Sequence, residues 1–154
     1  MTLQSLRRVF VTLFLAAALF GGIAGATSAD GPACIALDHG APAKPLLQLV
    51  PTSVGNGFVS IVGKRTHPVG GDRGVVSGGG VTINGVFEIT LQSTTIVTTP
   101  MFGPAPVLIS GSTHIFLSPA TQTGTFKTVE IVTSEGGGLS IEHTSGTAAV
   151  VPCP

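Results

Sequence analysis

Hydrophobic and polar residues alternate along much of this chain, most clearly between residues 81 and 99. Phe87 and the two hydrophobic residues that follow it at two-residue steps are separated by polar ones. A period of two places the hydrophobic set on one face of a strand and the polar set on the other. A short hydrophobic run before Phe87 ends at Asn84-Gly85, and Asn-Gly is a preferred pair in a type I′ hairpin turn. The pattern predicts a β-hairpin with one buried face.

Similar short runs recur on both sides of this hairpin. Strands are predicted at 46–50 and 58–62, joined through Asn56-Gly57, and then at 107–117, 125–134, 139–144 and 147–151. Pro51 is expected to end the first run, and Leu139 and Ile141 are expected to point inward. About seven to nine short strands with frequent turn signals predict an all-β domain, either an antiparallel β-sandwich or a small β-barrel.

Two stretches have the composition of loops. Residues 30–45 are rich in Pro, Gly and Ala and are predicted to be a lead-in loop before a single β domain at 46–154. Residues 63–80 hold Lys64, Arg65, His67 and Arg73 among several glycines. These four are candidates for an anion or ligand loop, because Gly-rich backbone can present N–H groups to a phosphate or carboxylate. A solvated charged loop is the favoured alternative, because no phosphate-binding motif is present.

The N-terminus has the three-part pattern of a secretory signal peptide. Arg7 and Arg8 precede a hydrophobic run, and small residues follow it up to residue 29. Cleavage is expected after Ala26 or Ala29, so residues 1–29 are assigned to the signal. We therefore expect a secreted or periplasmic protein.

Three alternatives to an ordinary cleaved signal remain open. An uncleaved anchor is one, because residues 9–26 are just long enough to cross a bilayer. A lipid anchor on Cys34 is another. The third is twin-arginine export, because Arg7-Arg8 resembles the core of that signal class, although Sec export is favoured.

The two cysteines lie near the two ends of the expected mature chain, at Cys34 and Cys153. In an oxidising compartment they are natural disulfide partners, and the termini of domains are often close together. Closing a loop of this size stabilises by about 4–5 kcal/mol in the chain-entropy model. A redox function is disfavoured because the sequence has no Cys-x-x-Cys pair.

The charge balance excludes some partners. The chain has seven Lys and Arg residues and seven Asp and Glu residues, and two of the basic residues lie in the signal. The mature domain is therefore weakly acidic, and its bulk charge attracts neither nucleic acid nor an anionic membrane. No stable membrane insertion is expected after signal cleavage.

Candidate catalytic and metal-binding residues are sparse. His114 and His143 are weak candidates for a metal site, but the sequence nominates no further ligands for a tetrahedral site. No serine lies in a G-x-S-x-G motif. Glu88, Glu130 and Glu142 fall on predicted polar strand faces, where a solvated carboxylate is expected. No cofactor is predicted, and the balance is against an enzyme.

The sequence thus predicts a non-enzymatic extracytoplasmic binding or surface-interaction protein. Its Thr-rich middle would give a weakly polar face for a protein or polymer partner, although Thr is also a common strand residue. The alternative is a small β-barrel that binds, or acts on, an apolar small ligand in its mouth. A filled interior would favour surface interaction, and an enclosed cavity with His114, His143 or a carboxylate pointing into it would favour the ligand barrel.

Overall fold

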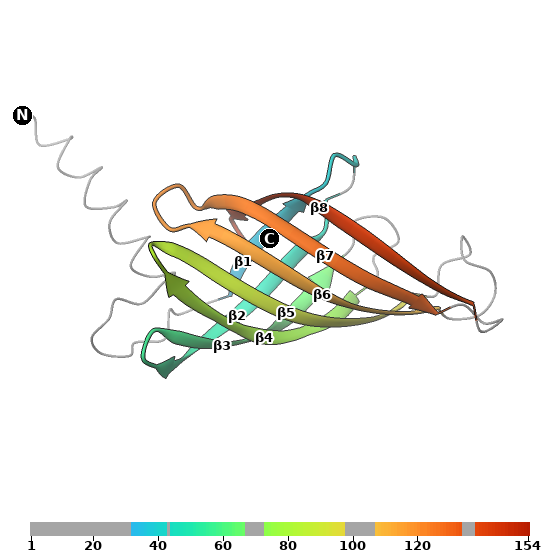
Figure 1. Ribbon diagram of the computed structural model, residues 1–154, viewed down its shortest axis with the longest axis horizontal. Coiled ribbons are helices and arrows are strands. Elements are labelled where there is room, and N and C mark those ends of the chain that lie inside the picture. Colours follow the sequence, from blue (N-terminus) through green and yellow to red (C-terminus); the bar gives the residue numbers. More distant parts are fainter. Residues whose placement is uncertain (1–31, 43, 67–72, 98–106, 134–137) are drawn as a thin grey trace, which may run out of the picture.

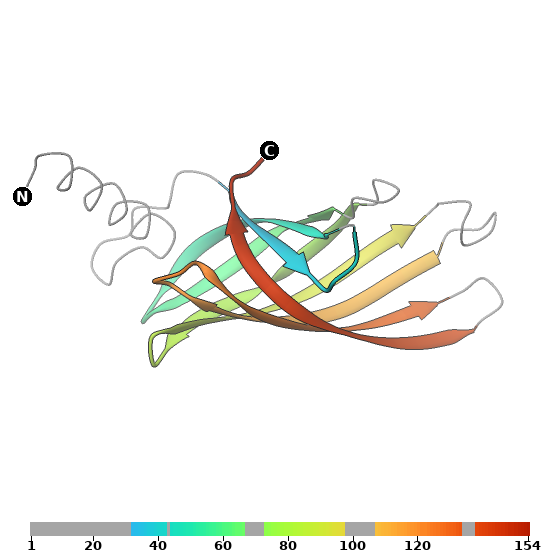
Figure 2. The same ribbon diagram turned by 90° about the horizontal axis from the view of Figure 1, so that it is seen from above.

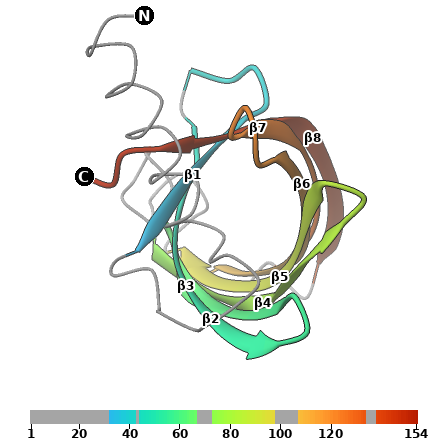
Figure 3. The same cartoon turned by 90° about the vertical axis from the view of Figure 1, so that its left-hand side faces the viewer.

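Eight strands in the described part of the chain form one antiparallel sheet that closes on itself (Figures 1 and 3). The computed structural model describes residues 32–42, 44–66, 73–97, 107–133 and 138–154. The strands are β1 (Ala33–Asp38), β2 (Leu46–Gly55), β3 (Phe58–Thr66), β4 (Arg73–Ile83), β5 (Val86–Val97), β6 (Val107–Ser118), β7 (Thr123–Thr133) and β8 (Leu139–Val151). Each strand pairs with the next, and β8 pairs with β1. The predicted all-β class is confirmed, and of the two predicted architectures the chain adopts the barrel.

The two ends of the barrel differ in their connections. At the end that we call the turn end, β2–β3 and β4–β5 are joined by tight turns at Asn56-Gly57 and Asn84-Gly85, and all four residues have positive φ. Positive φ at both central positions defines the type I′ turn, so the two predicted hairpin turns are confirmed. At the opposite end, the loop end, the connections are longer and comprise residues 39–45, 67–72, 98–106 and 134–138.

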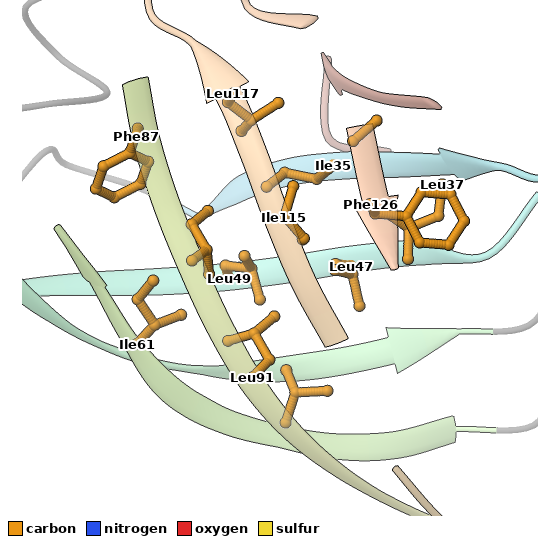
Figure 4. Close-up of a cluster of buried hydrophobic side chains, with 13 residues drawn as sticks. Ile35, Leu37, Leu47, Leu49, Ile61, Phe87, Leu91, Ile115, Leu117 and Phe126 are labelled. Atoms are coloured by element: carbon orange, nitrogen blue, oxygen red, sulfur yellow. The ribbon is translucent and has the colours of Figure 1, made fainter. Parts of the chain in front are cut away.

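An apolar core fills the part of the barrel nearer the turn end, around the start of β5 and the end of β6 (Figure 4). Phe87, Ile89 and Leu91 of β5 are buried, as their period of two predicts. The full cluster is Ile35, Leu37, Leu47, Leu49, Ile61, Val76, Phe87, Ile89, Leu91, Ile115, Leu117, Phe126 and Ala148. Every strand contributes at least one member, so the core ties the whole ring together.

Two predictions of loops were wrong. Strand β1 lies within the stretch 30–45, where its Ile35 and Leu37 are buried, and the end of β3 and the start of β4 together occupy most of the Gly-rich stretch 63–80. A Cβ atom at Gly63 or Gly78 would run into a backbone carbonyl of the neighbouring strand. These glycines therefore permit the close strand approach and bending that a small barrel needs to close. The abundance of glycine in this stretch thus reflects the closure of the sheet into a barrel.

Two predicted strand ends were also wrong. Strand β2 continues through Pro51, which lies beyond Leu49, the last β2 residue that pairs with β1. Pro51 thus sits where β2 has an open edge, the position at which a strand tolerates proline. Strand β8 continues through Gly146, where a Cβ atom would meet the backbone of Asp38.

A disulfide joins Cys34 and Cys153, as predicted, with a Cα–Cα distance of 5.2 Å. Cys34 is buried on β1, and Cys153 follows the end of β8, so the bridge locks together the two strands that close the barrel. No helix among the described residues has the length and hydropathy needed to cross a bilayer. The predicted signal peptide, residues 1–29, lies outside the described residues.

Candidate ligand-binding site

The inner face of the barrel changes from apolar to charged on the way from the turn end to the loop end. Paired residues of neighbouring strands share a face, so the strand register defines rows that run around the barrel wall. Successive rows across β5 to β8 read Ile89, Ile115, Phe126 and Gly146; then Leu91, Thr113, Thr128 and Thr144; then Ser93, Gly111, Glu130 and Glu142. Along these four strands the interior therefore has an apolar half towards the turn end and a polar half towards the loop end, where Val97 and Val107 are also buried.

Three hydroxyl groups of the polar half, those of Ser93, Thr113 and Thr128, are buried and hydrogen-bonded. Thr113 and Thr128 lie across from each other on β6 and β7, and their hydroxyl oxygens are 3.0 Å apart. The Ser93 hydroxyl donates to the carbonyl oxygen of Gly111 at 3.4 Å. In the described part of the chain, every fully buried side-chain polar atom has a hydrogen-bond partner. These residues thus form a stable polar layer next to the core.

An ion pair spans the interior beyond this layer. The Arg65 guanidinium, from β3, donates to the carboxylate of Glu130, from β7. The two side chains are only 16% and 13% exposed, so the pair is largely shielded from solvent. Glu130 was predicted to lie on a solvated face and Arg65 in a loop, and both predictions were wrong. Strand alternation turns both side chains inward.

A cavity of about 170 Å³ adjoins this ion pair. Its wall consists of Leu37, His39, Pro45, Arg65, Phe126, Thr128, Glu130, Glu142 and Thr144. Strand β1 pairs with β8 only over residues 147–151, so the first half of β8 extends past the end of β1 (Figure 2). This half of β8 carries Glu142 and Thr144. Because His39 and Glu142 are exposed, the cavity opens to solvent on this side.

The segment 39–45 between β1 and β2 supplies one side of the cavity, through His39 and Pro45. Asp38 anchors this segment: its carboxylate lies 2.6 Å from the Lys44 ammonium and accepts a 3.0 Å hydrogen bond from the Gly40 N–H. Two hydrogen bonds lower the pKa of the Asp38 carboxyl below its ordinary value of 3.8, and the bond from Lys44 has a larger effect than the bond from Gly40. The segment is thus held by local contacts at neutral pH.

The residues of the predicted anion loop are not gathered in one place. Arg65 points into the cavity, whereas its neighbour Lys64 is exposed on the outside of β3. Arg73 is exposed at the start of β4, opposite Thr66. His67 lies outside the described residues. Successive strand residues point to opposite faces, so the barrel wall separates Arg65 from Lys64.

Neither candidate histidine lines the cavity. His114 and His143 are both exposed on β6 and β8, and Nδ1 of His114 lies 3.3 Å from the hydroxyl of Thr90. Among the residues that the structure describes, no group of three or more His, Cys, Asp or Glu side chains is placed to hold a metal ion. The Thr-rich middle is also divided, because Thr113 and Thr128 point inward while Thr90 is exposed.

Sequence reasoning missed Glu142 and Thr144 because it assigned the faces of β8 in reverse. Leu139 and Ile141 were predicted to point inward, yet their side chains are 70% and 64% exposed. The signal that identifies the inner face lies further along the same strand, where the buried Ala148 shares the parity of Glu142 and Thr144. Strand β8 was treated as two runs broken at Gly146, so this signal was not used.

A second, apolar cavity of about 30 Å³ lies among Ile61, Phe87, Leu117 and their neighbours. It is large enough for roughly one or two water molecules.

Comparison of the chain with models of protein families, with curated proteins and with solved structures finds no match. The polar cavity is therefore the feature from which a function can be inferred.

Proposed function

We propose that this protein is an extracytoplasmic binding protein whose polar cavity, at the loop end of the barrel, holds a small polar ligand. The observation that carries the proposal is a 170 Å³ cavity lined by Arg65, Glu130 and Glu142. The proposal keeps the non-enzymatic binding role expected from the sequence and assigns it to the inside of the barrel.

The size of the cavity limits the ligand. An engineered protein cavity of about 150 Å³ binds benzene, so about 170 Å³ suits a molecule of about five to eight non-hydrogen atoms. The charged and hydroxyl groups of the wall favour a polar ligand over the apolar one expected for a barrel from the sequence. The apolar cavity is too small for an organic ligand of either kind.

Binding is favoured over catalysis by the partners of the cavity groups. The Thr128 hydroxyl is bonded to Thr113, and Glu130 is paired with Arg65. Both groups are thus bonded to structural partners. A nucleophile or a general base instead needs to contact the reacting group or an activating base.

An extracytoplasmic location is supported by two features. The Cys34–Cys153 disulfide is of a kind that persists in oxidising compartments. The first 29 residues have the composition of a secretory signal. Sec-dependent export with cleavage after Ala26 or Ala29 is the route that we propose.

A matched pair of variants tests the binding role. Thr144→Leu places a larger side chain in the cavity wall, and Ser145→Leu makes a similar change on the outer face of the same strand. ¹⁵N-labelled protein would be titrated with a panel of cationic, neutral and anionic compounds of the stated size. We expect Thr144→Leu to weaken binding by at least about tenfold and Ser145→Leu to leave it unchanged. If no compound shifts the resonances of cavity residues at millimolar concentration, the proposal is wrong.

A surface-interaction role is the second candidate. The outer face at the loop end exposes Ile96, Leu108, Ile131, Leu139 and Ile141 on four successive strands. Clustered exposed hydrophobic residues often mark protein contacts. A double substitution, Leu139→Ser with Ile141→Thr, would abolish a complex formed through this face, and native mass spectrometry of the protein purified from its source would detect the loss.

A further inference from the structure

We infer that the polar cavity selects a small organic cation, namely a primary ammonium compound with a short apolar body. The inference rests on the proposed binding function and specifies the chemical class of its ligand. Three features of the wall support it: its charge balance, the pairing of Arg65, and the apolar side chains that share the wall with the carboxylates.

The charge balance of the cavity is negative. Its charged side chains are Arg65, Glu130 and Glu142, and the single guanidinium is paired with Glu130. The ion pairs formed by the described residues are Arg65–Glu130 and Lys44–Asp38, and neither includes Glu142. The wall thus has one carboxylate more than it has guanidinium groups, and the unpaired carboxylate, that of Glu142, lies at the solvent-facing side.

The two carboxylates face the same space. Glu130 and Glu142 are directly opposite each other on β7 and β8, which places their Cβ atoms about 4.5–5.5 Å apart. Like charges directly opposite on a sheet destabilise each other. A cation bound beside Glu142 relieves this repulsion, so positive charge in the cavity is favoured.

An anionic ligand is disfavoured for the same reason. A ligand carboxylate or phosphate would bind the Arg65 guanidinium, which already donates to Glu130. Glu130 would then share its guanidinium with the ligand while it still faces Glu142, so three anionic groups would surround one cation inside a largely shielded site. A zwitterion has the same difficulty, because its own carboxylate would compete for Arg65.

The rest of the wall suits an organic cation better than a bare metal ion. Leu37 and Phe126 contribute apolar surface to the cavity, and Figure 4 shows the two side chains next to each other. This surface can cover a short hydrocarbon body, and the hydroxyl of Thr144 can accept a hydrogen bond from an ammonium group. Of the two carboxylates that the described residues place here, that of Glu130 is paired with Arg65, so Glu142 is the available anionic ligand, whereas Ca²⁺ takes about six to eight oxygen ligands.

Three probes of nearly equal size test the inference: n-pentylammonium, 1-pentanol and pentanoate. Each is titrated into the full mature protein, and binding is followed by the amide resonances of cavity residues. We expect pentylammonium to bind at least about tenfold more tightly than pentanol, and pentanoate to bind most weakly. Glu142→Gln should reduce the affinity for pentylammonium by about tenfold and leave that for pentanol unchanged.

The control variant is Glu88→Gln, because Glu88 projects from β5 away from the cavity wall. This change should not alter the affinity of any probe. Three results would each overturn the inference while the binding function stands. Pentanol or pentanoate could bind the cavity as tightly as pentylammonium or more tightly, or Glu142→Gln could leave the pentylammonium affinity unchanged. The third result is displacement of pentylammonium by Ca²⁺ alone. If none of the probes binds and the wider panel also fails, the binding function is wrong as well.

Discussion

The Arg65–Glu130 pair gives the sharpest test of the barrel interior. The guanidinium and the carboxylate come from β3 and β7, and among the described residues no other basic side chain lines the cavity except that of His39. Arg65→Met removes the positive charge, so that Glu130 faces Glu142 without compensation. Glu130→Gln removes a negative charge, and Glu142 remains as a second carboxylate for Arg65. We therefore expect the two substitutions to have unequal effects.

The exposure of the side chains sets the magnitude. Removing one partner of a fully buried ion pair destabilises by about 3–5 kcal/mol, whereas a surface pair contributes about 0–1 kcal/mol. At 16% and 13% exposure beside an open cavity, we expect about 2.5 kcal/mol for Arg65→Met. Glu130→Gln should cost about 1 kcal/mol, and the double variant about 2 kcal/mol. The coupling free energy is then about 1.5 kcal/mol.

Urea unfolding followed by far-UV circular dichroism measures these values. The sequence has no Trp or Tyr, so intrinsic fluorescence gives no useful signal. At an m-value of about 1–3 kcal/mol/M, Arg65→Met should lower the midpoint by roughly 1–2 M. Lys64→Met, on the outside of the same strand, should change stability by less than about 0.5 kcal/mol. Additive effects of the two single variants, or a larger effect of Glu130→Gln, would refute the reasoning.

Three further predictions concern the scaffold. The oxidised mature protein should have a mass two hydrogens below that of the dithiol, and reduction of Cys34–Cys153, which are 119 residues apart, should lower the free energy of unfolding by about 4–5 kcal/mol. The pKa of Asp38, measured by NMR, should lie below 3.8 and rise towards it in Lys44→Ala. Because folding lowers this pKa, the contribution of the pair is complete above the unfolded value and is lost as the pH falls through the folded one. Gly124→Ala should destabilise by about 1–3 kcal/mol, because its Cβ would meet a carbonyl oxygen of β6; the urea midpoint measures this, and an unchanged midpoint would contradict the close approach of the two strands.

The features predicted correctly are those that neighbouring residues determine. The two Asn-Gly pairs supply positive φ at both turn positions regardless of what surrounds them. The alternation in β5 places Phe87 and Ile89 in the core because every second residue of a strand shares a face. The disulfide, whose cysteines are 119 residues apart, is the exception: it was predictable because two cysteines in the chain and an expected oxidising compartment left one intramolecular pairing.

The closed barrel was not distinguished from a sandwich because closure depends on a distant contact. Strand β1 pairs with β8, which begins about a hundred residues later. The short segment 33–38, flanked by Pro and Gly, has no strong strand signal of its own. It is ordered because it pairs with β2 on one side and β8 on the other, which buries Ile35 and Leu37 in the core. This burial exists only once the ring has formed.

The faces of β7 and β8 show why the cavity was not predicted. In β7, Phe126 has even parity, while Val129 and Ile131 have odd parity, so the hydrophobic pattern supports either face. The strand has one register, and a shift by one residue would move all its side chains to the other side. Burial of the Phe126 ring decides the register, and Glu130, four residues later, must then point inward. The rule that polar residues face solvent fails there because this end of the interior is itself a polar cavity. An acidic residue four positions from a buried aromatic residue on the same strand faces the same side as that residue. This pattern thus indicates a charged site inside a barrel of this kind.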